Sequence, residues 1–115
     1  MPRFATPLIF SVLLAAAGCA SQQVPAARFA DTQAAISAAD AVGAEHEPRA
    51  ALHLKMARDQ LASARSLANE GDDDEASLAL KRANADAEMA LMVTREAEAR
   101  RASDKSAQDL QSLTN

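Results

Sequence analysis

Small and apolar residues recur at alternating intervals of three and four positions along two stretches of the chain, about residues 49–69 and 73–110. In the first stretch the repeating positions are Ala50, Leu54, Ala57, Leu61, Ala64 and Ala68. In the second stretch they are Ala76, Leu80, Ala83, Ala87, Ala90, Thr94 and Ala97. Helices that pack as coiled coils require this alternation. The pattern therefore predicts two helices that each bury one seam.

The residues between the two stretches contain the signals for a tight turn. Gly71 suits the left-handed position just after a helix, where residues with a Cβ are strained. Asp72 is predicted to be the N-cap of the next helix, with Glu75 reaching back to the Asp72 amide in a capping box. Two seams joined by such a short turn pack antiparallel, so we expect a helical hairpin.

The helix predicted at 73–110 also has a second apolar stripe. Its residues are Leu78, Ala85, Met89 and Met92, with Leu91 and Val93 beside them. A helix that is apolar on two faces needs two neighbours. The second neighbour is either a preceding helix, a second copy of the chain or another protein. This helix is also expected to be longer than its partner, so that its charged last turns project beyond the hairpin.

A third helix is expected before the hairpin, at about residues 26–44. The residues that share one face of it are Ala27, Ala30, Ala34, Ser37 and Ala41. Gly43 weakens the end of this helix, and Pro48 pushes the residue before it out of the helical region while suiting the first turn of the next helix. The expected fold class is all-α: an antiparallel hairpin with a preceding helix, forming a small three-helix bundle or coiled coil.

Composition agrees with this all-helical fold. Ala has the highest helix propensity and is a poor strand former, and it dominates residues 26–115, where Phe29 is the single aromatic residue. A length of 115 residues allows one small domain. The net charge is −4, and the basic residues are scattered among acidic ones. This distribution argues against a nucleic-acid-binding surface.

Residues 1–18 have the features of a secretory signal peptide. One basic residue, Arg3, precedes an apolar run from Leu8 to Ala17 that is too short to cross a bilayer. The run leads into Ala16-Ala17-Gly18-Cys19, which resembles the lipobox of bacterial lipoproteins, with Ala16 where Leu is commoner. The resemblance implies that Cys19 becomes the first residue and carries diacylglycerol and an acyl chain such as palmitate. The alternative is a plain leader cut after a small residue, which leaves Cys19 incidental.

A lipid on Cys19 predicts attachment to a membrane, because more than one acyl chain anchors a protein stably. Cys19 is the only cysteine, so it has no disulfide partner within the chain. Residues 19–25 are predicted to be an irregular tether, and residues 26–115 the helical domain. In lipoprotein sorting, a residue other than Asp at the second position, here Ala20, implies the periplasmic side of the outer membrane.

The sequence offers no arrangement that predicts catalysis or a metal site. His46 and His53 lie near two glutamates but lack a compact ligand spacing, so solvated surface is the preferred interpretation. The run Asp72–Asp74 lacks the alternating ligands of an EF-hand loop, and the methionine stripe is better explained by packing than by copper binding. We therefore expect no enzyme activity, and no catalytic residue, metal, cofactor or small-molecule substrate; the attached group is the lipid on Cys19.

Four segments of the hairpin carry a resemblance to a known family. They are Leu54-Lys-Met-Ala-Arg-Asp-Gln-Leu61-Ala-Ser-Ala-Arg, Ala68-Asn-Glu-Gly-Asp72, Glu75-Ala-Ser-Leu and Ala83-Asn-Ala-Asp-Ala-Glu. They resemble the bacterial envelope family catalogued as domain of unknown function 4398. The resemblance covers about residues 26–101 and implies a short Ala-rich lipoprotein with two helices joined by a Gly-Asp turn. Asp73 stands where members often have an aromatic residue, and the family implies no catalytic or ligand residue.

These features predict a non-enzymatic outer-membrane lipoprotein whose periplasmic helical domain is a structural or adaptor module of the cell envelope. Its expected partners are the membrane, through the lipid anchor, and either another envelope protein or a second copy. The alternative is a self-associating coiled-coil lipoprotein that stiffens the envelope like the murein lipoprotein. That family attaches to peptidoglycan through a C-terminal lysine, whereas this sequence ends Leu113-Thr114-Asn115, so covalent linkage is not expected.

Overall fold

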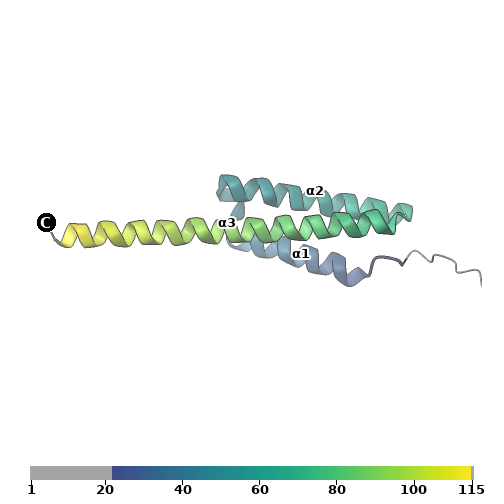
Figure 1. Cartoon of the computed structure of the whole chain (residues 1–115), viewed down its shortest axis with the longest axis horizontal. Coiled ribbons are helices and arrows are strands. Elements are labelled where there is room, and N and C mark those ends of the chain that lie inside the picture. The colour runs from purple at the N-terminus through teal and green to yellow at the C-terminus, as the bar shows by residue number, and fades with distance from the viewer. Residues whose placement is uncertain (1–21, 115) are drawn as a thin grey trace, which may run out of the picture.

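A computed structural model describes residues 22–114 and consists of three helices joined by short connections (Figure 1). The helices are α1 (Ala26–Ala41), α2 (Pro48–Glu70) and α3 (Asp73–Leu113), with a 3₁₀ turn, η1 (Ala44–His46), between α1 and α2. The prediction of an all-α fold built on a helical hairpin is confirmed. The signal peptide and the lipid site predicted at Cys19 lie outside the described residues.

The predicted seam between α2 and α3 is the core of the hairpin. Its buried members on α2 are Ala50, Leu54, Ala57, Leu61 and Ala64, and those on α3 are Ala76, Leu80, Ala83, Ala87, Ala90 and Thr94. Only the last seam positions, Ala68 beside the turn and Ala97 at the opposite end of the hairpin, are half-buried. Because most of these side chains are alanines, the two helix axes can approach closely. The larger Leu54, Leu61 and Leu80 supply most of the buried apolar area.

The turn between α2 and α3 has the predicted glycine but not the predicted capping box. Gly71 has φ 88° and ends α2 in the left-handed conformation. The Gly71 amide donates to the Ala68 carbonyl at 3.3 Å, and the Asp72 amide donates to the Leu67 carbonyl at 2.9 Å, which is the Schellman arrangement. Glu75 cannot reach back to the Asp72 amide, because Leu67 already accepts from it. The capping box was therefore a wrong prediction, and Asp72 makes no side-chain cap bond either.

The first helix ends earlier than predicted. It stops at Ala41, rather than near Ala44, and Gly43 adopts φ 76°. Ala44 then begins η1 and is completely buried. Pro48 is the first residue of α2, and the residue before it, Glu47, is extended, as the restriction imposed by proline requires.

The buried face of α1 also differs from the prediction. Ala27, Ala30, Ala34, Ser37 and Ala41 are all exposed. The buried residues are Thr32, Ile36 and Ala39, with Phe29 partly buried beside them. Ile36 and Phe29 have larger apolar side chains than alanine, so burying their face removes more apolar surface from water. The Thr32 hydroxyl is satisfied because it donates to the Arg28 carbonyl at 2.9 Å.

Polar contacts join α1 to α2 and complete the three-helix bundle. Arg58 of α2 donates to Asp40 of α1 at 2.5 Å, and Arg65 donates to Gln33 at 3.2 Å. The preceding helix therefore packs with the hairpin, as the predicted small bundle requires.

The C-terminal part of α3 projects past the bundle, as predicted. At about 1.5 Å per residue, α3 is about 60 Å long and α2 about 35 Å. The ion pair between Arg101 and Glu47, at 2.8 Å, marks the end of the bundle. Residues 98–114 are all exposed, and Figure 1 shows this segment continuing alone toward the C-terminus. We call residues 98–113 the overhang.

Candidate functional site

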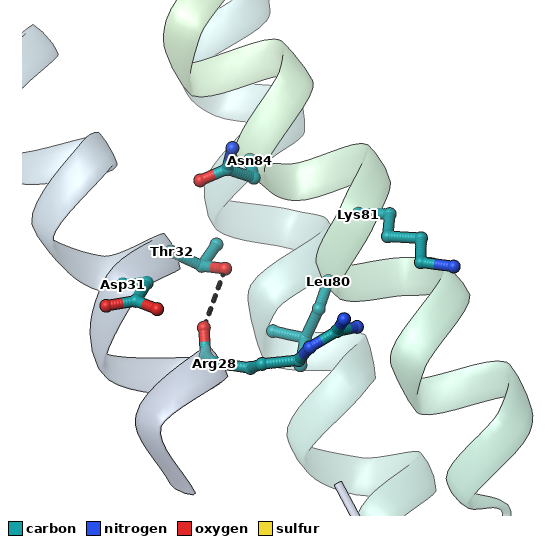
Figure 2. A pocket seen from close by; sticks show the side chains of 6 residues that line it. All are labelled: Arg28, Asp31, Thr32, Leu80, Lys81 and Asn84. Atoms are coloured by element: carbon teal, nitrogen blue, oxygen red, sulfur yellow. Dashed lines mark hydrogen bonds between the residues drawn. The ribbon is translucent and has the colours of Figure 1, made fainter. Parts of the chain in front are cut away.

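Helix α3 presents three faces, and two of them are covered within the chain. The first is the seam buried against α2. The second lies beside α1, where the guanidinium of Arg28 donates to the Ser77 hydroxyl at 3.2 Å. A cleft of about 290 Å³ lies beside this contact, between α1 and α3 (Figure 2).

The cleft between α1 and α3 is open and mixed in chemistry. Its lining residues are Arg28, Asp31 and Thr32 from α1 and Leu80, Lys81 and Asn84 from α3. The Thr32 hydroxyl that faces it already donates to the Arg28 carbonyl. Two cations, one carboxylate and an amide line it without converging on a common point in Figure 2. This cleft does not define a binding site for one class of small molecule.

The third face of α3 is apolar and exposed. It carries the stripe predicted from the sequence, with Leu78 47%, Met89 44% and Met92 65% exposed. Helix α1 does not cover it, because α1 packs beside Ser77 and Asn84 on an adjacent face. The preceding helix is thus excluded as the neighbour of this stripe. A second copy of the chain and another protein remain.

The exposed stripe continues through the overhang, which the sequence analysis missed. Positions spaced alternately by four and three residues from Leu78 lie on one face of α3 as far as Leu113. The members of this run are Leu78, Arg82, Ala85, Met89, Met92, Glu96, Ala99, Ser103, Ser106, Leu110 and Leu113. We call this run the second seam. Leu110 and Leu113 are 67% and 83% exposed, so the second seam ends in two large apolar side chains.

The first seam changes character where the second one continues. Beyond Ala97 its next positions are Arg101, Asp104, Gln108 and Gln111, all polar. This change occurs where α2 no longer covers α3. The large apolar side chains of the overhang therefore belong to the second seam. Counting heptads beyond Met92 in the sequence would have revealed it.

A polar cluster within the hairpin was also missed. His53 of α2 lies 2.9 Å from a carboxylate oxygen of Asp86 on α3, and the Gln60 amide donates to the other oxygen at 2.8 Å. The His53 and Asp86 side chains are only 34% and 17% exposed. The interpretation of His53 as a solvated surface residue was therefore wrong. Because Asp86 binds residues two turns apart on α2, the cluster fixes the register of the hairpin.

The cluster leaves one polar atom without a partner within the described part of the chain. The Gln60 side-chain oxygen is buried and accepts no hydrogen bond. A buried oxygen without a hydrogen bond lowers the free energy of unfolding. The cluster therefore fixes the register of α2 against α3 at some cost in stability. His46, the other histidine, is exposed and lies 3.7 Å from Glu45.

Carboxylates and histidines do not gather elsewhere. Within residues 22–114, no three His, Cys, Asp or Glu side chains lie close enough together to hold a metal ion. In the Asp72–Asp74 run, Asp73 is buried and accepts a hydrogen bond from the Val24 amide at 3.3 Å. No helix in the same range has the length and apolar composition needed to cross a membrane.

The contact between Val24 and Asp73 sets where the chain enters the bundle. Residues 22–25 are not helical, as expected for a tether. They lie beside the turn between α2 and α3, at the opposite end of α3 from the overhang (Figure 1). The two ends of α3 are thus distinct: one lies beside the tether and the other is free.

The family described as Domain of unknown function (DUF4398) matches residues 27–106. This range covers all three helices except the last turns of the overhang. No curated protein and no solved structure matches the chain.

Proposed function

Because the chain belongs to the DUF4398 family, a family without an assigned activity, we propose a role from its own residues: a non-enzymatic, lipid-anchored structural or adaptor module of the bacterial cell envelope. The exposed second seam of α3 carries the proposal. Five of its large side chains are at least two-fifths exposed, namely Leu78, Met89, Met92, Leu110 and Leu113. Large apolar side chains that are exposed at heptad spacing along one helix face are typical of a face that packs against a partner.

The N-terminal sequence supports anchoring by lipid. Cys19 directly follows a signal-peptide-like run and a lipobox-like segment. Its lipid would be joined to the bundle by the short tether that meets α3 beside Asp73. Ala20 at the second position favours the outer membrane, so the helices are proposed to lie on its periplasmic side.

The arrangement of the bundle suits an adaptor. The tether reaches one end of α3, and α3 extends about 60 Å from that end. The overhang therefore presents its apolar residues at a distance from the attachment point. The proposal assigns no catalytic residue, cofactor or metal.

Fractionation of cells that express the full chain tests the anchor. Cys19→Ser should move the protein from the membrane fraction to the soluble periplasmic fraction, whereas Ser21→Ala, a neighbouring change that keeps the cysteine, should leave it on the membrane. Ala20→Asp should shift the protein from the outer to the inner membrane. Membrane association of Cys19→Ser equal to that of the wild-type chain would contradict lipid anchoring.

Site-specific photocrosslinking tests the adaptor role. A crosslinking residue at Met89 should capture a protein in intact cells, and the same residue at Ala34, exposed on the outer face of α1, should not. Equal capture from both positions, or capture from neither, would contradict a specific role for the second seam.

A further inference from the structure

We infer that the partner of the second seam is the second seam of another copy of the chain, paired antiparallel, so that each overhang covers the exposed stripe of the other from Arg82 onward. This inference names the partner of the proposed interaction module and rests on that proposal for its setting in the envelope. Its observations are the continuous heptad spacing of the second seam and the matching dimensions of its two halves.

The two halves of the second seam have similar lengths, and both lack a packing partner within their own chain. The exposed stripe from Leu78 to Met92 is about 22 Å long, and the overhang is about 24 Å long. Neither is covered by its own chain. An isolated helical segment of this size is marginal in water without packing along one face. An antiparallel pair covers most of both halves of both copies with a single interface.

One antiparallel register places large side chains opposite small ones. When Leu110 lies level with Ala85 of the second copy, Met89 lies level with Ser106 and Met92 with Ser103. Alternation of large and small residues lets facing layers interlock without voids. In this register Leu78 lies just beyond the end of the facing helix, since α3 ends at Leu113. The register that instead places Leu110 level with Met92 leaves Arg82 and Ala85 uncovered as well.

Charge favours the antiparallel pair over the parallel one. In a parallel, in-register pair, Arg82 would face Arg82 and Glu96 would face Glu96 within the interface, which is unfavourable. In the antiparallel register, Arg82 lies level with Leu113 of the second copy, at the C-terminal end of its α3. The unpaired carbonyls and the dipole at that end favour a cation. Glu96 faces Ala99 and keeps its ion pair with Arg100 of its own helix, at 2.5 Å.

The pairing determines how the proposed lipid-anchored dimer would lie. Each tether meets its own bundle beside Asp73. In this register the two Asp73 positions are about 70 Å apart along the paired helices. Both tethers reach one membrane only if the paired helices lie along its surface.

Disulfide crosslinking of the full chain tests the pairing. Two differently tagged copies, one with Ala85→Cys and one with Leu110→Cys, are expressed together and oxidised. The pairing predicts a mixed disulfide dimer, because facing positions bring Cα atoms within the range of about 4.4–6.8 Å that a disulfide spans. Leu110→Cys paired with Ala34→Cys, on the outer face of α1, should give none. The chain without an introduced cysteine controls for any reaction of Cys19.

The outcomes separate the possible partners. A dimer between two Leu110→Cys copies, without one between positions 85 and 110, would overturn the antiparallel arrangement. Absence of every interchain disulfide, together with capture of a different protein at Met89, would overturn the inference and leave the adaptor proposal standing. Absence of both would overturn the inference and the adaptor proposal together.

A second measurement uses substitutions at the end of the overhang, beyond the ion pair between Arg101 and Glu47. Leu110→Glu combined with Leu113→Glu removes two apolar side chains at each end of the pair, so the dimer dissociation constant of the full chain in detergent should rise at least about tenfold. Gln111→Glu lies on the polar continuation of the first seam and should leave the constant unchanged. Equal dissociation constants for the double variant and the control would overturn the inference.

Discussion

The two seams of α3 have the same spacing but opposite environments. The first packs against α2 and is buried from Ala76 to Thr94. The second runs parallel to it along the same helix, and its large side chains remain exposed from Leu78 to Leu113. The first is also richer in alanine, so α2 can approach it closely, whereas the second carries Met and Leu. Spacing thus predicts that a helix has two packing faces, while the neighbours available in the chain decide which one is filled.

The difference is sharpest where α2 ends. Up to Ala97 the first seam carries only small or apolar residues, and the second seam carries them except at Arg82 and Glu96. Beyond it, the first seam becomes polar at Arg101 and Asp104, and the second continues to two leucines. If the overhang only extended α3 into solvent, neither of its two seams would need large apolar residues. The two leucines in the overhang therefore support the proposed partner outside the described bundle.

The largest expected effect comes from truncating the main anchor of the first seam. Leu54 is 1% exposed, and Leu54→Ala should lower the free energy of unfolding by about 2–5 kcal/mol because it leaves a cavity between tightly packed alanines. Leu52→Ala, on the exposed side of the same helix, should change it by less than about 0.5 kcal/mol. Urea unfolding followed by circular dichroism measures both. Equal losses for the two variants would contradict the assignment of the core.

Enlarging a small side chain compares the two seams directly. Ala83→Leu forces a large group between α2 and α3 and should destabilise the bundle by about 1–3 kcal/mol. Ala85→Leu, two residues along on the second seam, lies at an exposed position of the single chain, so in the diluted, monomeric protein it should change the free energy of unfolding by less than about 0.5 kcal/mol. Thermal unfolding of both variants measures the difference. A harmless Ala83→Leu would show that the first seam is not closely packed.

Removing the shared acceptor of the hairpin cluster should have a similar or smaller effect. Asp86→Ala leaves His53 and Gln60 without their partner at a partly buried site, which should cost about 1–3 kcal/mol. Glu88→Ala removes an exposed carboxylate that accepts an exposed hydrogen bond from the Asn84 amide, so it should cost little. Chemical unfolding of the two variants compares them. If Asp86→Ala is as stable as Glu88→Ala, the cluster does not hold the register.

The smallest expected effect is at the turn. Gly71 has φ 88° with open space where a Cβ would lie, so Gly71→Ala should cost only the conformational strain of about 1 kcal/mol. Asn69→Ala, at an exposed position two residues before it, should be neutral or slightly stabilising because alanine favours helix. A larger loss for Gly71→Ala would mean that the turn tolerates no adjustment.

The sequence predicted most of the hairpin because its signals are local and strong. The first seam, the Gly71 turn and the start of α2 at Pro48 follow from spacing and backbone chemistry at single positions. The projection of α3 also follows, since α3 has more residues than its partner. Each of these features is decided by the helix itself rather than by distant residues.

The features that the sequence did not predict depend on competition between groups. The prediction of a capping box was wrong because the Asp72 amide donates its hydrogen bond to the Leu67 carbonyl instead of to Glu75. The face of α1 was misassigned because alanine spacing is uninformative when Ile36 and Phe29 lie on another side. His53 meets Asp86 across the hairpin, and no local pattern in the sequence indicates such a contact.

Thiol labelling in intact cells tests most directly the claim that the second seam is an interaction surface. Met92→Cys and Ala34→Cys place one accessible thiol each on the second seam and on the outer face of α1. We expect a membrane-permeant maleimide to label Ala34→Cys fully in cells while Met92→Cys is protected, and to label both in the purified, diluted chain. Labelling of Met92→Cys in cells as fast as Ala34→Cys would contradict the account.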